Sequence, residues 1–187
     1  MNLNEKSQGK GKALPILKYP DMRLRDKSVP LDPAVIATHQ FQQQLEDMFA
    51  TMYAAPGVGL AAVQVGIHQR VMVLDIGINE GQLIRRDPKV IINPEITARD
   101  GKIVWEEGCL SCPDLIVEVE RSQTVTVQCL DRGGRLQQIV GQDLLAVALQ
   151  HEIDHMDGIL ILDRLSRLKV NIYKEKLQKE AQRQVVR

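Results

Sequence analysis

The sequence predicts an α+β domain whose sheets are mainly antiparallel. Apolar residues fall at helical spacing near the start and again near the end of the chain, whereas the middle carries short β-branched runs. Because these strands do not alternate with helices as βαβ units, a doubly wound parallel sheet is not expected. The 187 residues are enough for one domain with a core of its own.

The first helix is expected to start at Asp32-Pro33, because aspartate suits a helix N-cap and proline the first helical position. The apolar stripe of this helix consists of Phe41, Leu45, Met48, Phe49, Met52 and Tyr53. Pro56-Gly57 then ends it. This pattern is typical of a helix that packs one face on the core.

Strands are expected in the middle of the chain, over residues 70–76, 90–96, 116–120 and 124–130. Residues 131–134 read Asp-Arg-Gly-Gly, a turn signal. We therefore expect the last of these strands to form a hairpin with residues 136–140.

The end of the chain is expected to be mostly helical. A second helix should run from Asp143, a suitable cap, to Gly158, which suits the left-handed position after a helix. A short apolar run over residues 159–162 is interpreted as a strand. From Asp163 onward the pattern predicts a third, basic helix.

Composition limits the classes of function. The chain holds 24 basic and 24 acidic residues, so as a whole it has no electrostatic attraction for nucleic acid or an anionic membrane. It contains no apolar run long enough to cross a bilayer, and no membrane partner is expected. Three cysteines without a secretory signal argue against a disulfide framework. These observations predict a cytoplasmic protein with reduced thiols.

The most informative segment lies in the second predicted helix and reads His-Glu-Ile-Asp-His over residues 151–155. Residues four apart share one face of a helix, so His151 and His155 can bind one metal ion. Glu152 is about a quarter-turn away and can reach a water on that metal without being a ligand. The alternative is two surface histidines on an ordinary helix.

Two upstream segments offer further chemistry. Cys109, within residues 107–111, can supply a thiolate ligand, although most free cysteines are small buried hydrophobes. Residues 57–64 combine Gly59, where a backbone can come close to a ligand, with the amide donor Gln64. The alternatives for this segment are a plain helix-to-strand turn and, more weakly, a phosphate loop.

Together the three segments resemble, in order and spacing, the signature motifs of peptide deformylases. These segments are Gly57-Val58-Gly59-Leu60-Ala61-Ala62-Val63-Gln64, Glu107-Gly108-Cys109-Leu110-Ser111 and Gln150-His151-Glu152-Ile153-Asp154-His155. The resemblance extends from about Leu14 to the end of the chain. It implies a small α+β fold whose sheets wrap around the histidine helix, and an enzyme that removes the N-formyl group from the first methionine of newly made polypeptides.

The resemblance also implies one divalent metal ion bound by Cys109, His151 and His155. Ferrous iron is the metal expected in the cell, although the ligand set also suits Zn²⁺, Ni²⁺ and Co²⁺. In the implied mechanism metal-bound hydroxide attacks the formyl carbon, and Glu152 carries the proton from the water to the leaving amine.

Donors and a substrate pocket follow from the same resemblance. The Gln64 amide and the Leu110 backbone N–H are expected to stabilise the oxyanion. The backbone at Gly59 and Gly108 would pair with the substrate chain. The pocket for the methionine side chain is expected to be lined by Val58, Trp105, Leu144, Val147 and Ala148.

Two positions depart from the family pattern. Cys112 replaces a more usual aliphatic residue, and Ile116 stands where some members carry an arginine near the peptide groove. Cys112 also allows a rival reading, a closed structural zinc site formed with Cys109, His151 and His155. A second rival is a zinc endopeptidase, which would need a further ligand downstream of the histidines.

The predicted organisation is a flexible tail over residues 1–13, one catalytic domain over 14–163 and a basic helix over 164–187. The last segment holds eight basic and two acidic residues, a net charge of +6. The residues expected to dock it are Leu165, Leu168, Ile172 and the aliphatic stem of Lys176. Beyond Leu177 it should project into solvent, either as an ordinary charged surface or, as in some family members, as a contact with ribosomal RNA.

Overall fold

The computed structural model describes residues 11–79 and 84–185, so most of the predicted tail lies outside the described residues. The helices are α1 (His39–Ala54), α2 (Leu144–Met156) and α3 (Arg167–Val185). The strands are β1 (Gly59–Ala61), β2 (Val71–Leu74), β3 (Ile78–Asn79), β4 (Ile84–Arg85), β5 (Lys89–Asp100), β6 (Ile103–Cys109), β7 (Cys112–Arg121), β8 (Thr124–Leu130) and β9 (Leu136–Gln142). Short 3₁₀ turns are η1 (Met22–Arg25), η2 (Pro33–Val35), η3 (Ala62–Val65) and η4 (Ile161–Arg164).

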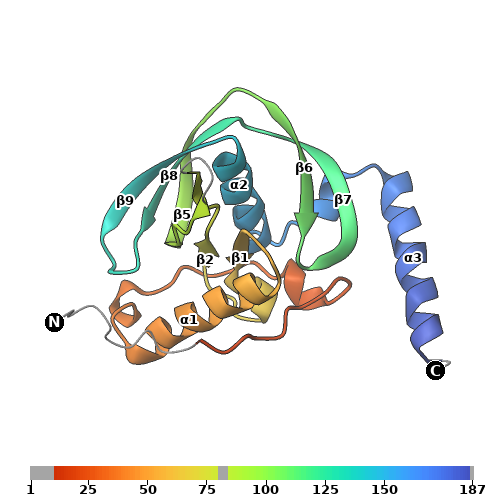
Figure 1. Cartoon of the computed structure of the whole chain (residues 1–187), viewed down its shortest axis with the longest axis horizontal. Coiled ribbons are helices and arrows are strands. Elements are labelled where there is room, and N and C mark those ends of the chain that lie inside the picture. Colours follow the sequence, from red (N-terminus) through yellow and green to blue (C-terminus); the bar gives the residue numbers. More distant parts are fainter. Residues whose placement is uncertain (1–10, 80–83, 186–187) are drawn as a thin grey trace.

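The strands form a five-stranded antiparallel sheet in the order β1-β2-β5-β8-β9 and two hairpins, β3–β4 and β6–β7. In Figure 1, α2 stands between the large sheet on one side and the β6–β7 hairpin on the other. The predicted α+β class, with antiparallel sheets around the histidine helix, is therefore confirmed.

The large sheet separates two apolar clusters. Val71 and Val73 of β2 pack in one cluster with α1, whereas Met72 and Leu74 pack in the other with α2. Successive strand residues point to opposite faces, so one short buried strand serves both clusters. The sheet thereby fixes α2 at the centre of the molecule, with its apolar side against the sheet.

The first helix begins later than predicted. Asp32 caps only the short turn η2, and α1 starts at His39, where the hydroxyl of Thr38 accepts a hydrogen bond from the Phe41 N–H at 3.3 Å. An Asp-Pro pair specifies one turn of helix but not its continuation. The predicted apolar stripe is otherwise correct, since its members are buried except Tyr53, which is half-buried.

The β6–β7 hairpin was only partly predicted. The strand predicted over 116–120 extends over the whole of β7, and β6 was not predicted at all. Most β6 side chains are exposed or half-buried, Val104 being 61% exposed, so the segment lacks the apolar run of a buried strand. By contrast, β8 has the predicted bounds and pairs with β9 as expected.

The strand predicted over 159–162 is wrong. Leu160, Ile161 and Leu162 are buried, but they lead into the turn η4 and pack against the hairpin and α3. A short apolar run indicates that a segment is buried, but a buried loop or turn has the same pattern as a buried strand. Gly158 does adopt the predicted left-handed conformation, with φ 73°. Asp143 does not cap α2 through its side chain, which instead accepts a hydrogen bond from Gln123.

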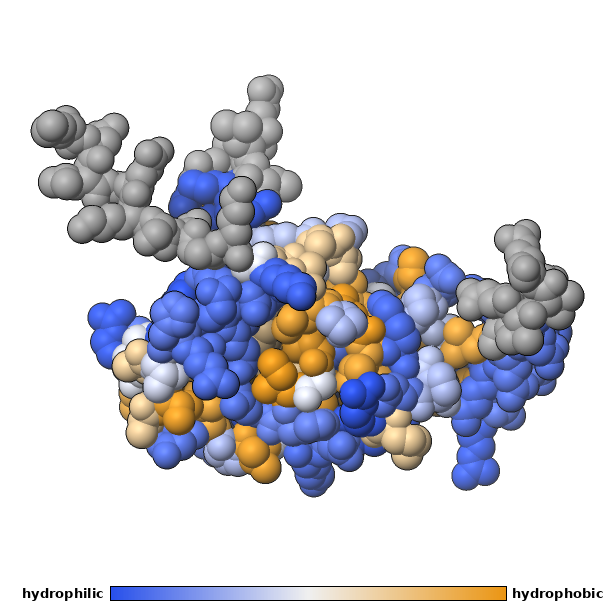
Figure 2. Space-filling view, turned by 90° about the horizontal axis from the view of Figure 1, so that it is seen from below, coloured by the Kyte–Doolittle hydropathy of each residue, from blue (hydrophilic) through white to orange (hydrophobic). Residues whose placement is uncertain are grey.

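The docking of the C-terminal helix was predicted only in part, since Leu165 packs against the core as expected but Leu168 and Ile172 do not. Tyr173 is 4% exposed and its hydroxyl donates to the Pro113 carbonyl at 3.0 Å, whereas Leu168 and Ile172 are 71% and 58% exposed. Figure 1 shows α3 standing along one side of the molecule, and Figure 2 shows apolar side chains among the hydrophilic surface at that end. No helix among the described residues is both long and apolar enough to cross a membrane.

The Gly158→Ala substitution should test how tightly the end of α2 is held. A Cβ at this position would lie 2.3 Å from the Arg25 carbonyl oxygen, in addition to the cost of φ +73°. We expect the free energy of unfolding to fall by about 2 kcal/mol or more in urea titrations. Gly134→Ala is the control, since it has φ +79° but meets its nearest atom at 3.5 Å, and about 1 kcal/mol is expected. Equal losses would contradict this account.

Candidate active site

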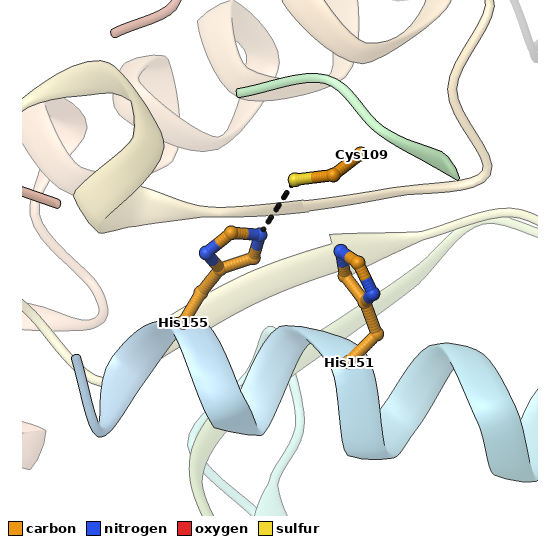
Figure 3. A group of neighbouring side chains, drawn as sticks. All are labelled: Cys109, His151 and His155. Carbon is orange, nitrogen blue, oxygen red and sulfur yellow. Dashed lines mark hydrogen bonds between the residues drawn. The ribbon is translucent and has the colours of Figure 1, made fainter. Parts of the chain in front are cut away.

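Three metal-binding side chains converge where β6 meets α2. His151 and His155 lie one turn apart on the same face of α2, and Cys109 at the end of β6 faces them (Figure 3). The Cys109 Sγ lies 3.2 Å from the His155 Nε2, and one ligand atom from each of the three residues lies within 4.8 Å of the others. The helix spacing and the strand end thus bring together donors from distant parts of the sequence.

This donor set fits a divalent transition metal. One thiolate and two imidazoles leave a fourth tetrahedral position open, as catalytic sites require. A hydrogen bond from the neighbouring Cys112 thiol lowers the pKa of Cys109 well below its ordinary value and favours the thiolate that binds metal. The site therefore has the ligands, the protonation state and the free position that a catalytic metal needs.

A buried ion pair orients His151. The Glu107 carboxylate lies 2.8 Å from the His151 Nδ1 and accepts hydrogen bonds from Arg121 at 2.7 and 3.0 Å. Burial raises the pKa of Glu107, but the bonds to His151 and Arg121 outweigh it, so the pKa is lowered. With Nδ1 occupied, the Nε2 of His151 is left for a metal, an arrangement typical of ligand histidines.

Sequence reasoning missed this ion pair. Glu107 was noted only as the first residue of a motif, and Arg121 was not considered. Arg121 could have been noticed because it is a charged residue two positions after Val119, on the same face of β7. That face is expected to be buried. Both Glu107 and Arg121 are 5% exposed, and buried charges of this kind are rarely found without partners.

Glu152 lies beside the histidines, and one of its two carboxylate oxygens has no partner in the part of the chain that the structure describes. It is 5% exposed, and its Oε2 has no hydrogen-bond partner in the described protein. Burial raises the pKa of this carboxyl above its usual range. Gly59 leaves the space for it, since a Cβ there would lie 2.6 Å from the Glu152 Oε1. The approach of a ligand to the Gly59 backbone stays a prediction.

Gln64 is held in a defined orientation. Its Oε1 accepts a hydrogen bond from the Ala61 N–H at 2.8 Å, so its amide nitrogen points the other way, and this nitrogen donates to the Ser111 hydroxyl at 3.2 Å. Gln64 is 1% exposed and Ser111 is fully buried. Ser111, which sequence reasoning did not single out, therefore positions an amide donor next to Leu110.

A cavity of about 480 Å³ opens over these groups. It is lined by every predicted site residue except His155, which lies deeper. The members on its apolar side are Val58, Trp105, Leu144, Val147 and Ala148. Gly59, Gly108 and Leu110 border it as well. A pocket of this size with an apolar wall and a few polar groups suits a small ligand or a peptide end.

Cys112 belongs to the core beneath the site. It is 1% exposed and packs with Leu24, Val119 and Tyr173. It is not part of the metal-binding group formed by the described residues. Burial and the adjacent Cys109 raise the pKa of its thiol, so it stays protonated as a hydrogen-bond donor. This arrangement favours three protein ligands over the closed four-ligand zinc site.

Comparison with known proteins identifies the family. The family model described as polypeptide deformylase matches residues 13–171. The chain belongs to the polypeptide deformylase family. The chain is therefore a deformylase, which is a hydrolase, and the family assignment does not support the zinc endopeptidase considered above.

Relatives support the assignment over most of the chain. A peptide deformylase of Stenotrophomonas maltophilia is 48% identical over 89% of this chain and 95% of its own. A crystal structure of the enzyme from Legionella pneumophila matches with a TM-score of 0.82 and 43% identity, covering 94% of this chain and 99% of that one. An Acinetobacter baumannii deformylase with Met-Ala-Ser bound matches with a TM-score of 0.75 and 33% identity, over 82% and 98% of the two chains.

Two cysteine variants should separate a ligand from a neighbour. Cys109→Ala should lose bound metal and activity, whereas Cys112→Val should keep its metal stoichiometry because Cys112 lies outside the donor group. Metal content of purified protein, measured by elemental analysis, is the readout. Loss of metal from Cys112→Val would support the four-ligand site instead.

Proposed function

We propose that this enzyme hydrolyses the formyl amide at the N-terminal methionine of nascent polypeptides, using one divalent metal ion. The observation that carries the proposal is the convergence of Cys109, His151 and His155 beside Glu152, a buried carboxylate with a free oxygen. Ferrous iron is the metal we propose in the cell, although the ligands also suit Zn²⁺, Ni²⁺ and Co²⁺.

Substrate recognition is assigned to the apolar cavity. The methionine side chain would lie against Val58, Trp105 and Leu144, and the peptide backbone would pair with Gly59 and Gly108. Met-Ala-Ser, bound in the Acinetobacter relative, begins with an unformylated methionine and so has the chemistry of the product. The formyl group of such a chain would then point toward the three metal donors.

The reaction needs an activated water, a proton carrier and donors for the oxyanion. A bound divalent cation supplies the first by lowering the pKa of its water from about 15.7 to about 7. Glu152 takes the water's proton on its free carboxylate and delivers it to the leaving amine. The Gln64 amide and the Leu110 N–H donate to the oxyanion, and Ser111 keeps that amide oriented.

The Glu152→Ala variant tests this division of roles. Because Glu152 is assigned to proton transfer and not to metal binding, the variant should keep its metal but release formate from formyl-Met-Ala about 10²–10⁴ times more slowly. Formate release and metal content are measured on the same preparations.

Glu120→Ala is a suitable control, since Glu120 is an exposed carboxylate on the same hairpin and lines neither hollow of the protein that adjoins the hairpin. It should retain both metal and turnover. A metal-free Glu152→Ala protein would contradict the assignment, and a parent enzyme that releases no formate would contradict the proposed function itself.

We further propose that the enzyme works in the cytoplasm and that the outer face of α3 contacts ribosomes. The three cysteines are free, and a reducing compartment keeps Cys109 available as a ligand. The segment from residue 164 onward carries a net charge of +6, whereas the chain as a whole has a net charge of zero. An ordinary solvated helix face is the alternative.

Neutralising the outer face of α3 should weaken ribosome binding without affecting chemistry. The exposed residues to change to glutamine are Arg167, Lys174 and Lys179. Deleting α3 is less suitable, because the deletion would also remove the buried side chain of Tyr173 and expose the core beneath it. We expect a weaker, less salt-sensitive association in cosedimentation with ribosomes, and unchanged turnover of formyl-Met-Ala.

The control carries the same charge change on other elements. Its exposed residues are Lys27, Lys102 and Arg135. This variant should bind ribosomes as the parent does at low salt. Equal binding by the α3 variant and the control would rule the contact out.

A further inference from the structure

A second hollow, of about 540 Å³, lies between β7 and α3. Its apolar floor includes Ile116, Leu165 and Ile172, and the first and last of these are 65% and 58% exposed. Exposed apolar side chains that face one another across a groove favour an apolar ligand. We call this hollow the β7–α3 groove.

The groove adjoins the active-site cavity at the β6–β7 hairpin. Glu106, Asp114, Leu115 and Ile116 line both hollows. In the β6–β7 ladder, Ile116 pairs with Gly108, the residue next to Cys109. The groove therefore starts beside the metal donors and leads away from them toward α3.

Two contacts join α3 to the hairpin at this groove. The Tyr173 hydroxyl donates to the Pro113 carbonyl at 3.0 Å, and the Lys176 ammonium lies 3.6 Å from the Asp114 carboxylate. Both contacts join α3 to the first residues of β7, so the helix is docked at one end of the groove. The ligand surface is thus preformed.

The walls carry groups of opposite charge. Glu106 and Glu118 belong to the hairpin, whereas Lys169 and Lys176 belong to α3. Carboxylates accept hydrogen bonds from backbone N–H groups, and ammonium groups donate to backbone carbonyls. A peptide backbone of any sequence can form hydrogen bonds with the charged groups of both walls. Apolar side chains of the peptide would in addition be buried against the apolar residues of the groove.

We propose that the β7–α3 groove binds the substrate's own chain at the fourth and later residues, with a preference for apolar side chains there. This inference rests on the proposed function, which places the formylmethionine in the adjoining cavity. An extended chain advances about 3.3 Å per residue, so the residues that follow the first three reach past Ile116 into the groove. The enzyme would then bind the nascent chain through residues beyond its first methionine and select among chains by these residues.

The test compares two formylated hexapeptides, formyl-Met-Ala-Ser-Leu-Leu-Leu and formyl-Met-Ala-Ser-Ser-Ser-Ser. In the parent enzyme, the leucine peptide should have a KM about three- to tenfold lower, with a similar kcat, because the groove buries its apolar side chains without touching the reacting bond. Ile172→Asn should remove most of this difference.

Leu168→Asn is the matched control, since Leu168 is 71% exposed on the same helix but does not line the groove. It should keep the parent's preference. Equal KM values for the two peptides in the parent, or the same behaviour of both variants, would overturn the proposal.

A binding measurement separates this proposal from the proposed function. The dissociation constants of unformylated Met-Ala-Ser-Leu-Leu-Leu and Met-Ala-Ser-Ser-Ser-Ser, from isothermal titration calorimetry, need no turnover. The leucine peptide should bind about three- to tenfold more tightly to the parent and to Leu168→Asn, but not to Ile172→Asn. If the binding preference is present but no formate is released, the proposed function is contradicted and the groove proposal stands. If formate is released but the binding preference is absent, the groove proposal is contradicted and the proposed function stands.

Discussion

The buried charge of Arg121 is the interaction on which the site depends. Its guanidinium, on β7, binds Glu107 of β6 and, at 2.5 Å, Asp154 of α2. Removing one partner of such a buried pair typically costs about 3–5 kcal/mol, because the remaining charge stays uncompensated. The hairpin therefore cannot shift away from α2 at low cost. Cys109, two residues after Glu107, is held against the histidines by this constraint.

The same constraint extends to the C-terminal part of the chain. Asp154 also accepts hydrogen bonds from Arg164 at 2.7 and 2.8 Å, so one carboxylate joins the hairpin, the histidine helix and the turn before α3. The cavity and the β7–α3 groove thus share a single charged anchor. Shifts of the turn before α3 are therefore opposed by the ion pairs that join the hairpin to the histidine helix.

Local patterns in the sequence predicted the elements that have strong periodicity. The histidine helix, β8 and its hairpin with β9 were found because their apolar spacing and turn residues agree. The side chains that line the cavity were implied by the resemblance to peptide deformylases. Long-range partners could not be predicted this way, since the pairing of Glu107 with Arg121 depends on the register of a hairpin whose first strand is largely exposed. The apolar run that includes Leu160 was wrongly predicted to be a strand. This run is buried, and burial alone does not specify a strand.

The contact between Gly59 and Glu152 limits how this enzyme can be redesigned. A methyl group at Gly59 would lie 2.6 Å from the Glu152 Oε1 and 2.7 Å from the Leu74 Cδ2, so a side chain at this position would displace the Glu152 carboxylate. The opposite wall offers more freedom, because Trp105 and Leu144 are only partly buried and come from separate elements. Engineering of the first-residue specificity, for instance toward bulkier formylated amino acids, therefore has to proceed from the hairpin and the first turn of α2.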